Sequence, residues 1–150
     1  MAKPLRITKD GKMVFKEDVE HVNFANYLTA KGFQYHHSPN EQMVNTTSQV
    51  NWMYKKAKMG TKSGYPDFEI FLPHTTVYIE MKRVDCTFSS CSHNQKYWLF
   101  FLDDRECSIA TWSKGCNAAI NFFENVVSGN ITIGMTEWLK HKDKIMNKGI

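Results

Sequence analysis

The chain has no cysteine arrangement typical of a disulfide-rich scaffold or a zinc module. Its 150 residues include four cysteines, none of which forms a CxxC pair, and the spacing of Cys86, Cys91 and His93 fits no familiar zinc site. The sequence also has no long apolar segment, no signal-peptide-like apolar region, no internal repeat and no low-complexity tract. We therefore expect a soluble cytoplasmic protein with reduced thiols and no membrane partner.

Composition limits the number of domains and the class of partner. Hydrophobic residues make up 42% of the 150 residues and aromatic residues 13%. This is enough apolar material for one well-buried domain, and the chain is too short for two domains of ordinary size. The 19 Lys and Arg residues against 15 Asp and Glu give a formal net charge of +4. Such a mild excess suits a polyanionic partner but does not indicate one by itself.

Apolar periodicity and turn signals divide the chain into three parts. Residues 1–16 are basic and lack clear periodicity, so we expect an N-terminal arm or a short hairpin. Residues 17–127 carry the helix and strand signals of the expected domain, and residues 128–150 form a C-terminal extension with a short helix capped by Thr136. Within the domain we expect helix 17–31, strand 33–37, helix 49–60, hairpin 64–83, a helix from Ser92, strand 107–112 and a helix from Ser113.

This order of elements predicts an α/β domain with a mixed β-sheet flanked by helices. The hairpin requires antiparallel pairing, whereas strand 107–112 reaches the sheet through a helical crossover. Two helix ends have specific signals. Gly32 follows the first helix as a stop, and Ser92 with Gln95 three residues later forms a capping-box signature.

The expected hairpin has one apolar face and one charged face. If Leu72 pairs with Val77, the alternation places Asp67 opposite Lys82 and Glu69 opposite Glu80 on the charged face. The residues expected on the apolar face are Phe68, Ile70, Leu72, Val77, Ile79 and Met81.

Two carboxylates and an ammonium group are expected to converge on the charged face. Asp67 and Glu80 are diagonal neighbours in this register, and Lys82 follows Glu80 on the same face. Crowded carboxylates repel one another, and a divalent cation among them removes that cost. The alternative interpretation is a solvated sheet face whose charges only keep an edge soluble.

The residues around this hairpin resemble a known nuclease motif. Pro66-Asp67, a gap of twelve residues and Glu80-Met81-Lys82 resemble the PD-(D/E)XK pattern. The ordered blocks "SPNE", "MGTKSGYPDFEIF", "VYIEMKR" and "SHNQKYWLFFL" resemble the VRR-NUC family of that superfamily, in its phage-type single-domain form. The likeness covers about residues 17–125, and Leu99 stands where relatives often have Tyr.

The resemblance implies a restriction-endonuclease-like core and metal-dependent hydrolysis of DNA. In the family, the residues at the Asp67 and Glu80 positions bind Mg²⁺ or Mn²⁺ together with the main-chain carbonyl at Met81. Lys82 is then expected to orient the attacking water or to stabilise charge on the phosphate. The implied protein is an endonuclease acting on DNA, with branched or Holliday-junction DNA as the candidate substrate and a homodimer as the expected assembly.

Two further residues have alternative interpretations. Glu20 matches an acidic residue of the family's first helix that faces the site and helps hold a metal, although Glu17 and Asp18 are close enough to make the assignment ambiguous. A helix also favours acidic residues in its first turn without any metal. Gln95 matches a catalytic-support glutamine of the family, but the capping box alone would also explain it.

The expected nucleic-acid contacts come from residues before the hairpin. Lys58 and Lys62 precede Gly64 and are candidates for contact with a phosphate backbone, and His37 and Asn40 are candidates for contact near the scissile bond. Basic runs are also common on solvated helix faces, and a histidine pair at a strand end is usually structural. The alternative function is a non-catalytic nucleic-acid-binding domain that retains the nuclease fold, and nothing in the sequence separates DNA from RNA as substrate.

Overall fold

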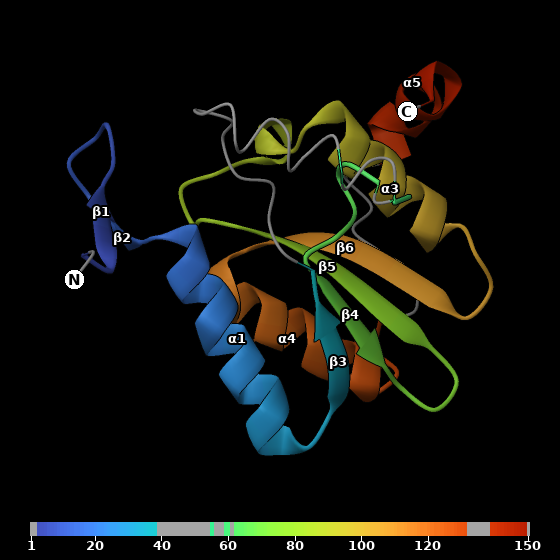
Figure 1. Ribbon diagram of the computed structural model, residues 1–150, viewed down its shortest axis with the longest axis horizontal. Coiled ribbons are helices and arrows are strands. Elements are labelled where there is room, and N and C mark those ends of the chain that lie inside the picture. Colours follow the sequence, from blue (N-terminus) through green and yellow to red (C-terminus); the bar gives the residue numbers. More distant parts are fainter. Residues whose placement is uncertain (1–2, 39–54, 56–58, 61, 132–138, 150) are drawn as a thin grey trace.

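The computed structural model describes residues 3–38, 55, 59–60, 62–131 and 139–149, with side chains from residue 142 onward in the last range. A four-stranded mixed sheet in the order β3-β4-β5-β6 forms its centre. Helices cover both faces of this sheet (Figure 1). The predicted α/β class with a mixed sheet is therefore confirmed. The strands of this sheet are β3 (Gln34–His37), β4 (Phe68–Phe71), β5 (Thr76–Lys82) and β6 (Ser108–Lys114).

The first residues form a small antiparallel hairpin outside the main sheet. Strands β1 (Leu5–Ile7) and β2 (Met13–Phe15) pair only with each other in a two-stranded sheet. Gly11 has φ 82°, a value that glycine adopts without strain, and its N–H donates to the carbonyl of Thr8 in the turn. Of the two forms expected for residues 1–16, the structure has the short hairpin, and Figure 1 shows it projecting from the body of the protein.

Helix α1 (Glu17–Lys31) packs on the apolar face of the sheet together with α4 (Gly115–Val127). Phe24 of α1 is fully buried and meets Phe68 of β4 edge to face, with ring centroids 4.9 Å apart. The helix ends as predicted at Gly32, which has φ 78° and donates its N–H to the carbonyl of Thr29. This packing fixes the start of α1 beside the start of β4 and the end of β5.

Strands β4 and β5 pair in a register that differs by two residues from the predicted one. Ile70 lies opposite Val77 and Phe68 opposite Ile79, because the N–H of Leu72 closes the turn on the carbonyl of Thr75. A shift of two residues keeps every side chain on its face, since the period of a strand is two. The predicted apolar face is confirmed on its main members: Phe68, Ile70, Val77, Ile79 and Met81 are fully buried.

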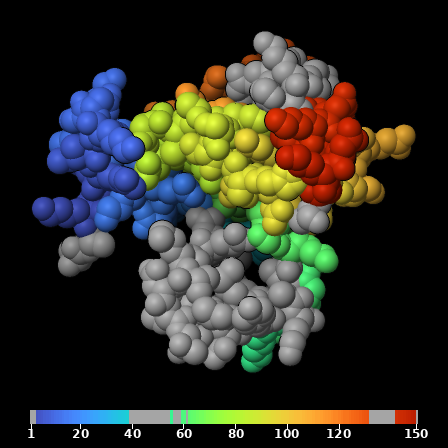
Figure 2. All heavy atoms as spheres, turned by 90° about the horizontal axis from the view of Figure 1, so that it is seen from above, coloured from blue at the N-terminus to red at the C-terminus, as the bar shows by residue number. Residues whose placement is uncertain are grey.

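A helical crossover joins β5 to β6 on the other face of the sheet. The predicted helical crossover is present: α3 (His93–Asp103) with the short 3-10 turn η1 (Phe88–Ser90) makes the connection, and β6 runs parallel to β5. Ser92 is the N-cap of α3, which confirms the predicted start. Helix α5 (Leu139–Lys148) packs beside α3, and Figure 2 shows the two in contact as yellow and red surfaces.

The predicted start of α4 at Ser113 is wrong. Ser113 lies in β6, opposite Met81, and the strand continues to Lys114 before the helix begins at Gly115. The pairing of β6 with the end of β5 outweighs the capping preference of the serine. Most of the predicted helix 49–60 and the predicted cap Thr136 lie outside the described residues. No described helix is long and apolar enough to cross a membrane.

Candidate active site

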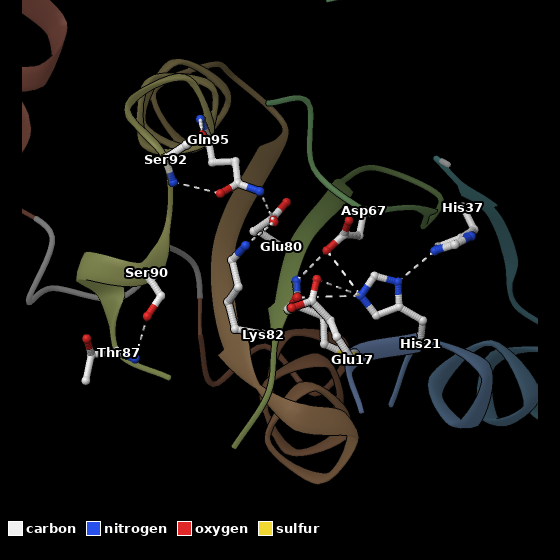
Figure 3. Close-up of polar contacts among 11 residues, drawn as sticks. Glu17, His21, His37, Asp67, Glu80, Lys82, Thr87, Ser90, Ser92 and Gln95 are labelled. Carbon is white, nitrogen blue, oxygen red and sulfur yellow. Dashed lines mark hydrogen bonds and ion pairs between the residues drawn. The ribbon is translucent and has the colours of Figure 1, made fainter. Parts of the chain in front are cut away.

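Polar side chains from four elements meet where β5 passes between the first turns of α1 and α3 (Figure 3). Asp67 comes directly before β4, and continuing the observed register by one residue places it opposite Glu80 of β5. Lys82 ends β5, and Gln95 lies in the first turn of α3. The structure therefore brings together the four residues predicted as catalytic.

Asp67 is buried beside the backbone of β5 and has few donors. It is 4% exposed, and its Oδ2 accepts the N–H of Met81 at 2.8 Å. Burial raises the pKa of this carboxyl to about 7; the Met81 N–H opposes the change, and the charge of Glu17 adds to it. The environment thus disfavours the negative charge on Asp67 unless a further cation is present.

Glu80 is the most buried carboxylate of the site. It is 1% exposed, and its Oε1 accepts from the Gln95 amide at 2.5 Å and lies 3.3 Å from the Lys82 ammonium. Its Oε2 has no hydrogen-bond partner among the described residues. Burial and the nearby Asp67 hold the pKa of Glu80 well above its usual value, although Lys82 opposes the change. Within the described structure, this oxygen lacks the hydrogen bond that buried polar atoms usually make.

Lys82 is the cation of the site. Its side chain is 11% exposed and approaches Glu80. Burial alone would lower the pKa of Lys82, but the charges of Glu80 and Glu17 together raise it above the ordinary lysine value. The ammonium group is therefore charged at neutral pH. It lies beside Oε1 of Glu80.

Gln95 makes the predicted capping box and also contacts Glu80. Its side-chain Oε1 accepts the backbone N–H of Ser92 at 2.7 Å, while the backbone N–H of Gln95 donates to the Ser92 hydroxyl at 3.2 Å, which completes a capping box. With the amide oxygen held in this way, the amide nitrogen points at Glu80. The helix cap therefore positions the hydrogen-bond donor of the site.

Gly64 allows the chain before Asp67 to lie against α3. It has φ 83°, and a Cβ at this position would come within 2.6 Å of the backbone at Asn94 and Gln95. No other residue fits such an approach without moving the first turn of α3. The glycine of the "GYPD" segment thus sets the distance between Asp67 and the residues contributed by α3.

Sequence reasoning missed one member of the site and left another open. Glu17 and His21 lie one turn apart on α1, and their side chains join Asp67 in a group whose possible ligand atoms are all within 4.8 Å of one another. Burial raises the pKa of Glu17, while burial and the neighbouring His37 lower the pKa of His21 to about 4, so the imidazole is neutral at neutral pH. The available signal was the i, i+4 pair of a carboxylate and a histidine in the first turns of α1.

Glu20 occupies a different place from the predicted one. Its Oε2 accepts the N–H of Cys116 at 2.5 Å in the first turn of α4. A Cβ on Gly115 would stand 3.0 Å from the same oxygen, so this contact is tight. Of the three acidic residues weighed for α1, the structure brings Glu17 and not Glu20 into the group around Asp67.

Glu69 does not face Glu80 as the predicted register required. It lies opposite Tyr78, and its Oε2 accepts the Tyr65 hydroxyl at 2.5 Å. Burial, this hydrogen bond and the charges nearby raise the pKa of Tyr65 above its usual value. Glu69 thus belongs to a tyrosine cluster beside the site.

The predicted nucleic-acid contacts are only partly placed. His37 ends β3, is exposed and lies with its Nε2 2.9 Å from Nδ1 of His21. Lys62 is exposed shortly before Gly64, while Lys58 and Asn40 lie outside the described residues. In the described part of the chain, Cys86, Cys91 and His93 form no metal-ligand group.

The donor set of the site fits a divalent cation. Glu17, Asp67 and Glu80 carry three potential negative charges against the positive charge of Lys82 and, at Glu17, that of Arg83, and all three carboxyls have raised pKa values. The donors are oxygens and an imidazole nitrogen, and one of the oxygens is buried without a partner in the described structure. A hard or borderline divalent ion would relieve this imbalance.

Comparison with known proteins assigns no family to the chain. No protein-family model, no curated protein and no solved structure matches it. The likeness to a nuclease family therefore rests on the sequence motifs alone.

Proposed function

We propose that the chain is a Mg²⁺- or Mn²⁺-dependent nuclease that hydrolyses phosphodiester bonds of DNA, built on a restriction-endonuclease-like PD-(D/E)XK core. The observation that carries the proposal is the buried pair Asp67 and Glu80, which has raised pKa values, an oxygen without a described partner and Lys82 alongside. Such a pair is costly to a fold unless a cation uses it.

The metal ligands of this proposal are the carboxylates of Asp67 and Glu80 and the carbonyl oxygen of Met81. When bound, the ion would lower the pKa of a bound water and offset negative charge on the phosphate. Asp67 is held for this role by the N–H of Met81, and Glu80 by Gln95 and Lys82, all through one oxygen of each carboxylate. The second oxygen of Glu80 remains for the ion.

Lys82 serves as the fixed cation of the proposed reaction. Its ammonium group lies 3.3 Å from Glu80, which keeps it charged and at the edge of the ligand set. A cation in that place can orient the attacking water or stabilise the phosphoryl oxygens as their charge grows. The hydrogen bond from Gln95 holds the carboxylate of Glu80 in one position, which keeps its distance from the Lys82 ammonium group constant.

A cationic pocket between α3 and α5 supports a polyanionic substrate. His93 and Lys96 in the first turns of α3 and Lys144 and Lys148 of α5 line a pocket of about 230 Å³. Lys96 follows Gln95 directly, so one helix carries both a wall of the pocket and the amide that donates to Glu80. Cations grouped in this way suit the phosphates of a nucleic-acid strand that continues past the site.

The resemblance of the sequence to phage-type nucleases extends the proposal to branched DNA, such as a Holliday junction, cut by a homodimer. Two sites related by a twofold axis would act on two strands. The second candidate function is a non-catalytic nucleic-acid-binding domain. Buried carboxylates that repel phosphate count against it, because a binding surface gains nothing from Asp67 and Glu80.

Cleavage of a substrate panel tests the proposal. The full chain would be incubated with linear, flapped and four-way-junction DNA and with the matching RNA, in MgCl₂, MnCl₂ or EDTA. We expect cleavage that requires the metal and disappears in the D67N variant, while H74F, which changes an exposed histidine at the far end of the hairpin, cleaves normally. Binding without cleavage in either metal would favour the non-catalytic domain, and cleavage that persists in EDTA would refute the proposal.

A further inference from the structure

The imidazole of His21 faces the same point as the proposed metal ligands. Its Nε2 lies 3.5 Å from Oδ2 of Asp67, 3.5 Å from the carbonyl oxygen of Met81 and 3.9 Å from Oε1 of Glu17. Figure 3 shows the ring entering from α1 on the side of Asp67, opposite Lys82 and Gln95. The ring is 3% exposed, so this arrangement belongs to the interior of the protein.

We propose that His21 is a ligand of the metal, with Glu17 as a further carboxylate on the same ion; this rests on the proposed function. Two ligands bound through bonds of about 2.1 Å lie roughly 3.0–3.5 Å apart at angles of about 90–110°. The separations of His21 Nε2 from Asp67 and Met81 match this range, and that from Glu17 needs only a small movement of a half-exposed side chain.

His37 gives the histidine ligand its support. Its Nε2 lies 2.9 Å from Nδ1 of His21, and the two rings meet edge to face with centroids 5.1 Å apart. A metal-bound imidazole usually donates its second N–H to a neighbouring acceptor, which fixes the tautomer and the direction of the lone pair. With Nδ1–H donated to His37, the lone pair of His21 Nε2 points at Asp67 and Met81. His37 is thus a positioning residue.

An independent observation on the opposite side of the site indicates a cation. Glu80 Oε2 is buried and has no hydrogen-bond partner in the described structure, and Glu80 adjoins Asp67 closely enough for their charges to interact. The combined set contains carboxylate and carbonyl oxygens and one imidazole nitrogen. Imidazole favours Mn²⁺, and more strongly Co²⁺, Ni²⁺ and Zn²⁺, over Mg²⁺. The site therefore selects Mn²⁺ over Mg²⁺.

Calorimetric titration of the full chain with MnCl₂ and with MgCl₂ tests the proposal without measuring activity. The variants are H21F, which keeps an aromatic ring beside Phe68, H21Q, which offers an oxygen, and H74F as the control. We expect the Kd for Mn²⁺ to rise by about 10- to 100-fold in H21F, the range seen when groups supporting a ligand are lost. H21Q should bind the two ions with similar affinity, H37F should show a smaller loss than H21F, and H74F should match the wild type.

The outcomes separate this inference from the proposed function. Thermal melts in EDTA establish whether each variant is folded. If H21F does not fold, the Mn²⁺ titration of H21Q replaces it. Unchanged Mn²⁺ binding in H21F, or equal affinity of the wild type for Mn²⁺ and Mg²⁺, would overturn the role of His21 while leaving metal-dependent cleavage intact. A wild type that binds neither ion would overturn both proposals, and loss of binding in D67N but not in the histidine variants would overturn the histidine ligand alone.

Discussion

Glu20 and Glu80 are both buried carboxylates, 5% and 1% exposed, but they have opposite surroundings. Glu20 accepts the N–H of Cys116 at the start of α4, a helix whose N-cap residue Lys114 makes no side-chain capping hydrogen bond. Glu80 adjoins Asp67, and one of its oxygens has no partner among the described residues. Burial alone therefore does not distinguish the two carboxylates, whereas the Glu80 oxygen without a described partner does.

Each carboxylate accordingly has a different consequence for the molecule. Glu20 provides a tertiary cap that ties α1 to α4, where a helix N-terminus favours negative charge. Burial and the neighbouring Asp67 disfavour the negative charge of Glu80 in the folded state, and a bound ion would offset this cost. The comparison predicts that stability depends on the first residue and activity on the second.

The largest effect is expected on cleavage. E80Q and D67N should each lower the single-turnover rate about a thousandfold, or about 4 kcal/mol in the barrier, because each removes a metal ligand without changing side-chain size. E20Q should cleave within about threefold of the wild type wherever circular dichroism shows it to be folded. An E20Q variant that is folded but as inactive as E80Q would contradict the purely structural role of Glu20.

The next effect is expected on the free energy of unfolding. E20A should lower it by about 1–3 kcal/mol, since the buried N–H of Cys116 loses its acceptor. E80A in EDTA should cost less than E20A, because truncation of Glu80 also removes its repulsion with Asp67. Urea denaturation of both variants measures the difference. A larger loss in E80A than in E20A would contradict the assignment of the structural role to Glu20.

The stability of the metal-free protein should fall between pH 6.5 and pH 8.5. The pKa of Asp67 is raised to about 7 and that of Glu80 is raised well above its usual value, so the folded state retains protons that the unfolded chain has released. The pKa of His21 is lowered to about 4, which has the opposite effect, but only between pH 4 and its usual value of 6.5. Above pH 6.5 the contribution of His21 has ended, and the raised pKa values of the carboxyls set the direction of the change.

Urea denaturation in EDTA at the two pH values measures this linkage. The wild type should lose more stability than E80Q between the two pH values, because one of the carboxyls whose pKa the fold raises is absent from the variant. Addition of MnCl₂ should restore more stability at pH 8.5 than at pH 6.5, since the ion binds the ionised carboxylates. Equal pH profiles for the wild type and E80Q would show that Glu80 is satisfied in the metal-free fold.

The smallest effect separates the two roles of Gln95. Q95A should lower the cleavage rate by about tenfold, because Glu80 loses the donor that fixes its Oε1. S92A removes the hydroxyl acceptor but leaves the Gln95 amide in place, so it should cost about 1 kcal/mol of stability with little change in the cleavage rate. Similar cleavage by the two variants would reduce Gln95 to a helix cap.

In the hairpin, local sequence patterns predicted the two faces but not the register. Alternation placed Phe68 and Ile79 on the core face and Glu80 on the other, and these placements hold because the period of a strand is independent of its exact pairing. The register itself was predicted wrongly by two residues, since turn closure between Leu72 and Thr75 is not encoded in the alternation. The capping box at Ser92 was predictable because both of its partners lie within one turn.

Contacts between distant segments were not predictable in the same way. The choice among the acidic residues of α1 depends on how the helix is rotated against β5, which turns Glu17 towards Asp67 and Glu20 towards α4. His21 was overlooked because its significance lies in its proximity to Met81, which is sixty residues away in the chain. The helix start predicted at Ser113 failed for the same reason, since the pairing of β6 with β5 extends the strand.

Anomalous diffraction recorded at the manganese edge from crystals soaked in MnCl₂ would locate the proposed ion. We expect one strong peak roughly 2.0–2.3 Å from oxygens of both Asp67 and Glu80, and no such peak in crystals of E80Q. No peak at this pair in a protein that cleaves DNA with Mn²⁺, or a peak at Glu20 in its place, would contradict the proposed metal site.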